Sequence, residues 1–203
     1  MPDRLALPWP TPARHILLIC LALLVVSCSR DKPSRLTATE VVLAVGDSLT
    51  HGYGVDRDKT YPAQLQARVP ARVVAAGENG ETSAGLLRRL EQLLSEDDYD
   101  WVLICTGGND MLRGAQSALA SNLLRAIEMV RAADATPVLI AVPRPRTSED
   151  HPVYRRVARQ SGAELIDGLG AKLARKHFQM DRIHPNAAGY RLIAEHIADH
   201  FAG

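Results

Sequence analysis

Residues 41–50 read VVLAVGDSLT, and this stretch decides the fold. Its first half, VVLAV, is wholly apolar and rich in valine, which is typical of a β-strand buried on both faces. A strand of this kind belongs in a parallel sheet covered by helices on both sides. Gly46 ends the apolar run, and the polar segment after it begins with Asp47 and Ser48. The stretch therefore predicts a strand that delivers polar side chains to one edge of a sheet.

The same pattern recurs along the chain. Apolar runs predict further strands at residues 71–76, 101–106, 137–142 and 163–166. Helices are predicted at residues 61–69, along the leucine stripe of residues 86–94, around residues 119–130 and at residues 187–201. Strands that alternate with helices predict a flavodoxin-like, three-layer α/β/α sandwich with a five-stranded parallel sheet.

Length and composition limit the class of protein. The 203 residues, 46% of them hydrophobic and 23% charged, suit one soluble domain. The net charge of +1 gives no field that would attract nucleic acid, so no nucleic-acid partner is expected. The 3 cysteines lack metal-clip spacing and no nucleotide-binding glycine loop occurs, so neither a metal nor a cofactor is expected. The chain is expected to be a monomer.

Residues 1–27 differ from the rest of the chain. Basic residues and prolines precede an apolar run, ILLICLALLVV, at residues 16–26. A membrane-spanning helix needs about 20 apolar residues, so this shorter run predicts a cleaved secretory signal rather than an anchor or a core helix. Residues 25–28, VVSC, resemble the lipobox of bacterial lipoproteins. That resemblance implies cleavage before Cys28 and lipidation of Cys28.

The lipobox resemblance also implies a location. A lipidated Cys28 would hold the protein on a membrane of the bacterial cell envelope. The residue after the cysteine is Ser29 rather than an aspartate. By the sorting pattern of bacterial lipoproteins, this indicates the periplasmic face of the outer membrane. Residues 28–39 show no apolar periodicity and are expected to form a tether, with the folded domain at residues 40–203.

Polar motifs stand beyond the predicted strands. They read GDSLTHGYG at residues 46–54, ENGETS at 78–83, GGNDMLRG at 107–114 and DRIHPN at 181–186. Active sites of parallel sheets lie beyond the carboxyl ends of the strands, so Ser48, Gly80, Asn109 and His184 are expected to meet at one edge. A nucleophile, a base and donors for an oxyanion are the parts that acyl transfer needs.

Together these four motifs resemble the SGNH (GDSL) hydrolase superfamily, in its thioesterase I, arylesterase and lysophospholipase branch, over residues 41–201. The resemblance implies that Ser48 is the nucleophile, that His184 is the general base and that Asp181 orients His184. It also implies an oxyanion hole formed by the backbone N–H groups of Ser48 and Gly80 and the side-chain amide of Asn109. An enzyme of this type needs no cofactor.

Other residues adjoin the expected site. Leu49, Met111 and Pro185 are neighbours of the catalytic positions and are expected to contact the acyl group of the substrate. The segment PRPRTSEDHP, residues 143–152, is expected either to border the substrate groove or to be a solvated loop. His51 competes as the base, but no carboxylate adjoins it in sequence, which favours His184.

The predicted function is hydrolysis of acyl esters or thioesters, on small molecules or lipids, through an acyl-enzyme on Ser48. Two alternatives stay open at this point. The same residues would serve an O-acetylesterase that acts on an envelope polysaccharide or peptidoglycan. A catalytically silent binding protein would keep the fold, but the intact Ser48, Asn109 and His184 argue against it.

Overall fold

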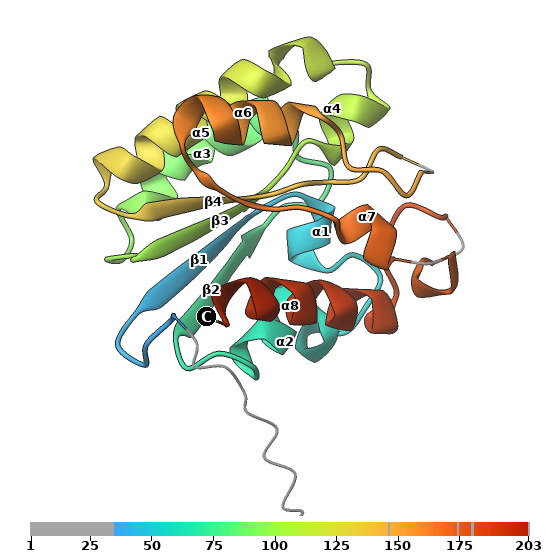
Figure 1. Ribbon diagram of the computed structural model, residues 1–203, viewed down its shortest axis with the longest axis horizontal. Helices are drawn as coiled ribbons and strands as arrows, with labels where there is room; N and C mark the ends of the chain where they lie inside the picture. Colours follow the sequence, from blue (N-terminus) through green and yellow to red (C-terminus); the bar gives the residue numbers. More distant parts are fainter. Residues whose placement is uncertain (1–34, 146, 174, 180, 203) are drawn as a thin grey trace, which may run out of the picture. The chain divides into compact units, whose positions relative to one another are not determined.

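The computed structural model describes residues 35–145, 147–173, 175–179 and 181–202. A five-stranded sheet forms the centre of this part of the chain (Figure 1). Its strands are β1 (Val41–Gly46), β2 (Arg72–Gly77), β3 (Trp101–Cys105), β4 (Thr136–Ile140) and β5 (Glu164–Ile166). They pair in parallel in the order β2-β1-β3-β4-β5. The predicted flavodoxin-like fold is confirmed, since this is the strand order of that fold.

Helices cover both faces of the sheet (Figure 1). On one face pack α3 (Ser83–Leu94), α5 (Leu119–Ala132) and α6 (Val153–Ser161), and on the other α2 (Tyr61–Gln66) and α8 (Ala187–Phe201). Short helices complete the described chain: α1 (Ser48–His51), α4 (Gly108–Leu112), α7 (Leu169–Lys172) and the 3-10 turns Arg57–Lys59, Gln116–Ala118 and Arg175–His177. The side chains of Thr60, Thr82 and Asn186 accept backbone N–H groups at the starts of α2, α3 and α8, which fixes where these helices begin.

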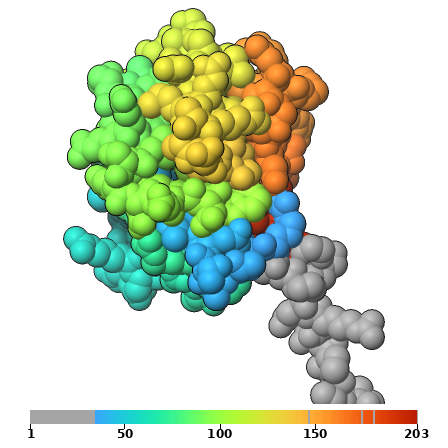
Figure 2. All heavy atoms as spheres, turned by 90° about the vertical axis from the view of Figure 1, so that its left-hand side faces the viewer, coloured from blue at the N-terminus to red at the C-terminus, as the bar shows by residue number. Residues whose placement is uncertain are grey.

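The central strands form the core. Val42, Leu43 and Val45 of β1 are fully buried, as are the apolar residues of β3 and β4 beside them apart from Trp101. Figure 2 shows the end of the molecule at which the strands begin, with the segment that leads into β1 at the surface. The strands all run away from that end, so the polar motifs of the sequence gather at the opposite edge.

One helix and some boundaries differ from the sequence-based expectations. Helix α6 was not anticipated, although its buried residues Val153, Tyr154, Val157 and Ala158 have helical spacing. Its two apolar turns are short and separated by arginines, which weakens the pattern. The helix expected at residues 61–69 ends at Gln66, and the strands are shifted slightly at their ends, the usual uncertainty of element boundaries.

The folded domain begins before the expected boundary at residue 40. Leu36 is only 2% exposed, so it belongs to the core. Arg35 donates its backbone N–H to the carbonyl of Phe201 at 2.6 Å, and its guanidinium pairs with Glu164 at 2.8 Å. Residues 35–39 are thus part of the domain rather than of a tether.

The predicted signal segment, Cys28 and the remaining tether lie outside the described residues. Among the residues that the structure describes, none of the helices has the length and hydropathy to cross a membrane.

Candidate active site

Ser48 is the first residue of α1, and one residue, Asp47, separates it from the end of β1. The tight turn into α1 depends on Gly46, because a Cβ there would lie 2.0 Å from the carbonyl oxygen of Cys105. Asp47 caps α1: its side chain accepts the N–H of Leu49 at 3.0 Å. The turn leaves Ser48 at the carboxyl edge of the sheet, 9% exposed.

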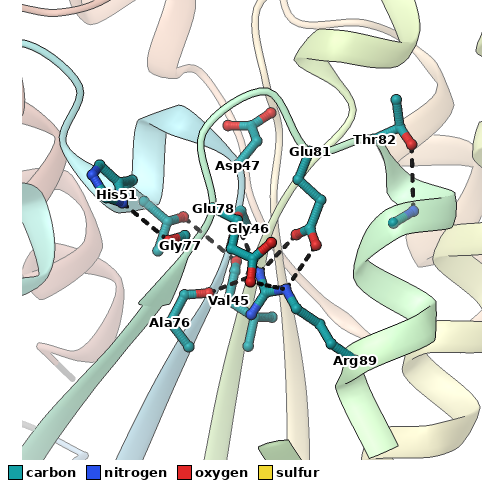
Figure 3. Close-up of polar contacts among 12 residues, drawn as sticks. Val45, Gly46, Asp47, His51, Ala76, Gly77, Glu78, Glu81, Thr82 and Arg89 are labelled. Carbon is teal, nitrogen blue, oxygen red and sulfur yellow. Dashed lines mark hydrogen bonds and ion pairs between the residues drawn. The ribbon is translucent and has the colours of Figure 1, made fainter.

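His184 joins Ser48 to Asp181. Its Nε2 lies 2.9 Å from Ser48 Oγ, and its Nδ1 lies 2.7 Å from Asp181 Oδ2. Because the carboxylate can only accept, Nδ1 carries the proton and Nε2 is free to accept the serine proton. The predicted base is therefore in contact with the predicted nucleophile. His51 instead faces the carbonyl of Gly77 at 3.2 Å (Figure 3), so it does not compete.

The carboxylate of Asp181 holds the turn at residues 181–184 in place. Oδ1 of this residue accepts the backbone N–H groups of Ile183 at 2.9 Å and His184 at 3.0 Å, while Oδ2 faces the imidazole. Burial tends to raise the pKa of Asp181, but the hydrogen bonds from His184 and Ile183 outweigh it and lower the pKa. The carboxylate is thus held ionised where it orients the ring.

Gly80 lies in a loop and Asn109 in the short helix α4, which a hydrogen bond from Asn109 joins to that loop. Gly80, in the loop between β2 and α3, has a φ of 76°, a conformation that favours glycine. Asn109, the second residue of α4, donates Nδ2 to the carbonyl of Glu81 at 3.0 Å. Asn109 shares a cleft with Ser48 and His184, whereas Gly80 lines a second, polar cavity.

Two buried carboxyl groups, those of Asp47 and Asp110, support these segments. Asp110 accepts both the N–H and the hydroxyl of Ser83, at 2.8 and 2.6 Å. Burial raises the pKa of Asp47 to about 7, with a smaller contribution from the charges of Asp110 and Glu81, against hydrogen bonds from the N–H groups of Leu49 and Gly108. Asp47 therefore connects the start of α1 to that of α4.

A cleft of about 420 Å³ opens beside Ser48. Its apolar lining residues come from several loops and helices and are Leu49, Leu112, Val142, Pro143, Pro145, Leu169, Leu173, Phe178, Ile183, Pro185 and Ile193. The predicted contacts Leu49 and Pro185 are among them. Met111 is not: it packs half-buried against the core, and the next residue of α4, Leu112, turns towards the cleft instead. Pro143, Arg144 and Thr147 of the segment 143–152 border the cleft as well.

Besides part of the cleft lining, sequence reasoning missed two residues that contact His184 or its loop. The ring of Tyr53 lies against that of His184, with centroids 4.4 Å apart. Gln179 donates Nε2 to the carbonyls of Tyr53 at 2.6 Å and Pro185 at 3.0 Å, which ties the loop after α1 to the loop of the histidine. Tyr53 belongs to the motif GDSLTHGYG, so its place in the sequence could have identified it. No local pattern marks Gln179.

The chain is similar to known proteins. The model of the GDSL-like lipase/acylhydrolase family matches residues 44–192, which include Ser48, Asn109 and His184. Thioesterase 1/protease 1/lysophospholipase L1 of Escherichia coli is 34% identical over 175 residues, 81% of this chain and 84% of its own. Esterase TesA of Pseudomonas aeruginosa is 34% identical over 194 residues, 88% of this chain and 92% of its own.

The likeness extends to solved structures. The crystal structure of TesA aligns with a TM-score of 0.70 and 34% identity over 78% of this chain and 96% of its own. The fold, the motif order and the match over most of the chain agree with one another. The chain belongs to the GDSL-like lipase/acylhydrolase family.

Proposed function

We propose that the protein is a serine esterase that hydrolyses acyl esters or thioesters through an acyl-enzyme on Ser48. The observation that carries this proposal is the hydrogen-bonded chain from Ser48 Oγ through His184 to Asp181, with steps of 2.9 and 2.7 Å. A serine hydroxyl is a weak nucleophile until a base takes its proton, and this chain supplies the base and its orienting carboxylate. The names of the relatives, thioesterase, lysophospholipase and esterase, support the ester class.

In the acylation step, Ser48 Oγ attacks the carbonyl carbon of the ester and its proton passes to Nε2 of His184. The electron pair of the C=O bond moves onto the oxygen, which becomes an oxyanion. When the tetrahedral intermediate collapses, the bond from the carbonyl carbon to the leaving group breaks. His184 gives its proton to the departing alcohol or thiol, and the acyl group stays on Ser48.

Three donors are assigned to the oxyanion. The N–H of Ser48 is at the first position of α1, where no partner exists inside the helix. The N–H of Gly80 lies in the adjoining loop, and the amide of Asn109 keeps a second hydrogen after its bond to Glu81. Fixed donors aimed at the developing charge need no reorganisation during the reaction, which is why such groups accelerate acyl transfer.

Deacylation repeats the same steps with water. His184 takes a proton from a water molecule, whose oxygen attacks the acyl carbon. The proton then returns to Ser48 Oγ as the bond between the acyl carbon and the serine oxygen breaks, and the free acid leaves. Asp181 stabilises the imidazolium that forms in both half-reactions and remains ionised itself.

The cleft supports an apolar acyl group as the part of the substrate that is bound. Leucine, isoleucine, proline and phenylalanine side chains line most of it, and about 420 Å³ is within the range of small-molecule pockets. Burial of an alkyl chain against these side chains would favour binding, because it removes apolar surface from water. An acetyl group would leave most of the apolar lining exposed to water. This observation favours longer acyl groups over the O-acetyl esters of a polysaccharide.

The test uses residues 29–203 and p-nitrophenyl esters from acetyl to palmitoyl, with Ser48→Ala as the matched control. We expect turnover to peak at medium acyl chains and to be lost in Ser48→Ala. Turnover confined to the acetyl ester would move the assignment to an O-acetylesterase. No Ser48-dependent turnover on any ester would contradict the proposed function.

We also propose that lipidation of Cys28 anchors the enzyme in the bacterial envelope, on the periplasmic face of the outer membrane. The lipobox-like sequence VVSC supports this, together with the short apolar run before it. Seven residues or fewer would then separate the lipid from the domain, because Leu36 is already buried in the core. Ester substrates dissolved in or released from the membrane would be close to such an enzyme.

A further inference from the structure

The guanidinium of Arg89 lies beneath the loop that carries Gly80 (Figure 3). Arg89 belongs to α3, and its side chain is only 17% exposed. Its Nε and Nη2 both donate to the carboxylate of Glu81, at 2.7 Å each, and the Glu81 side chain is only 6% exposed. This fork of two parallel bonds fixes both the position and the plane of the pair.

Arg89 also reaches the ends of two strands. Its Nη2 donates to the carbonyl of Ala76 in β2 at 2.9 Å and to that of Gly46 in β1 at 3.2 Å. The Gly46 carbonyl accepts the N–H of Glu78 as well, at 2.9 Å. Gly46 stands two residues before Ser48, so a single guanidinium connects the turn of the nucleophile to the loop after β2.

Glu81 continues this connection to the third part of the site. Its backbone carbonyl accepts Nδ2 of Asn109 at 3.0 Å, and Gly80 precedes it directly in the chain. One hydrogen of the Asn109 amide is therefore used to hold the amide plane, and the other remains for the substrate. Any displacement of Glu81 would move Gly80 and rotate Asn109 at the same time.

Helix α3 leaves room for the side chain of Glu81 to reach Arg89. A Cβ at Gly85 would lie 2.8 Å from Cγ of Glu81, so α3 has a glycine where the Glu81 side chain passes. A buried ion pair is a poor source of net stability, because the desolvation of both charges offsets their attraction. Arg89 donates four hydrogen bonds, two to Glu81 in the loop and one to each of two strand ends. A need for fixed geometry explains this arrangement better than stability does.

We propose that Arg89 and Glu81 are positioning residues for the oxyanion site: they hold Gly80 and Asn109 in register with Ser48. Neither touches the reacting atoms, and both act through Asn109 and the loop of Gly80. The inference rests on the proposed esterase function. It predicts that loss of the pair lowers kcat, while KM stays nearly constant because the acyl cleft is unaltered.

The experiment is a double-mutant cycle on p-nitrophenyl ester hydrolysis by Arg89→Met, Asn109→Ala and the double variant. Arg88→Met is the matched control, since Arg88 is the exposed neighbour on the same helix and bonds the carbonyl of Ala84 in its own helix. We expect Arg89→Met to lower kcat by about tenfold to a hundredfold, as a displaced catalytic group does, with KM changed by less than about threefold. In the Asn109→Ala background the same change is expected to cost less than about threefold.

Two results would overturn the inference: a kcat for Arg89→Met equal to that of Arg88→Met, or an equal loss in both Asn109 backgrounds. Circular dichroism and the urea midpoint show whether each variant is folded. If Arg89→Met is not folded, Glu81→Gln replaces it in the same cycle, because it keeps the shape of the side chain and removes the charge. The same two outcomes then support or overturn the inference. Failure of the proposed function is distinguishable, because the unchanged protein would then show no Ser48-dependent turnover.

Discussion

The imidazole of His184 lies against the ring of Tyr53, with ring centroids 4.4 Å apart and planes tilted by 40°. The two residues come from loops far apart in sequence, and Gln179 ties the same loops through the carbonyls of Tyr53 and Pro185. Asp181 holds one side of the imidazole through Nδ1, and Tyr53 covers its face. His184 thus has an aromatic contact, with Tyr53, in addition to its hydrogen bonds to Asp181 and Ser48.

Removal of this contact tests its importance. We expect Tyr53→Ala to lower kcat/KM by up to about tenfold, since an aromatic pair contributes about 0.5–1.5 kcal/mol beyond its buried area. Tyr53→Phe retains the ring and is expected to have nearly unchanged kinetics. The measurement is steady-state hydrolysis of a medium-chain p-nitrophenyl ester. Equal activity of Tyr53→Ala and Tyr53→Phe would show that the stacked ring does not orient His184.

Asn109 supplies a second prediction. We expect Asn109→Ala to lower kcat by about a hundredfold to a thousandfold with little change in KM, because it removes one donor to the oxyanion and leaves the apolar lining of the cleft in place. Asn109→Asp is the closest match in shape, and it places an acceptor where the donor was. A kcat for Asn109→Asp near that of the unchanged enzyme would contradict the oxyanion role.

The sequence predicted the fold and the centre of the site because both follow from local patterns. Short apolar runs marked the strands, and each polar motif stood after a strand end, so the topology alone brought Ser48 and His184 to one edge. Asp181 followed from the family resemblance, and it lies only three positions before His184 in the same turn. No long-range information was needed for these assignments.

The remainder of the site depends on side-chain directions and on pairs that are distant in sequence. Met111 was expected at the substrate, but one residue along a helix rotates the side chain by about 100°, and Leu112 lines the cleft instead. The contacts of Gln179 with Tyr53 and of Arg89 with Gly46 join segments that no spacing rule connects. Leu36 was assigned to a tether because a lone leucine in a polar segment has no periodicity to reveal its burial.

The proposed anchor has its own test. In a bacterial host, we expect a palmitate probe to label the full chain, and we expect Cys28→Ala to abolish the label and release the protein from the membrane fraction. Cys105→Ala is the matched control, because Cys105 is buried in β3 and is expected to leave labelling unchanged. Equal labelling of Cys28→Ala and the unchanged chain would contradict lipidation at Cys28.

The raised pKa of Asp47 predicts how stability depends on pH. Burial shifts this pKa from 3.8 to about 7 in the folded protein. Between these two values, the folded state holds a proton that the unfolded state has released. The free energy of unfolding therefore decreases through this group as the pH rises from about 4 to about 7, and the loss is complete above that range.

Asp47→Asn isolates this contribution. The amide cannot ionise, so the pH-dependent loss of stability through residue 47 disappears. Its side-chain nitrogen would face the N–H of Gly108, which removes one hydrogen bond and lowers stability at every pH. We expect the free energy of unfolding in urea to fall less between about pH 5 and about pH 8 in Asp47→Asn than in the unchanged protein. Parallel pH profiles for the two proteins would mean that Asp47 is ionised throughout. The buried carboxylate would then be held by the N–H groups of Leu49 and Gly108 strongly enough to outweigh its desolvation.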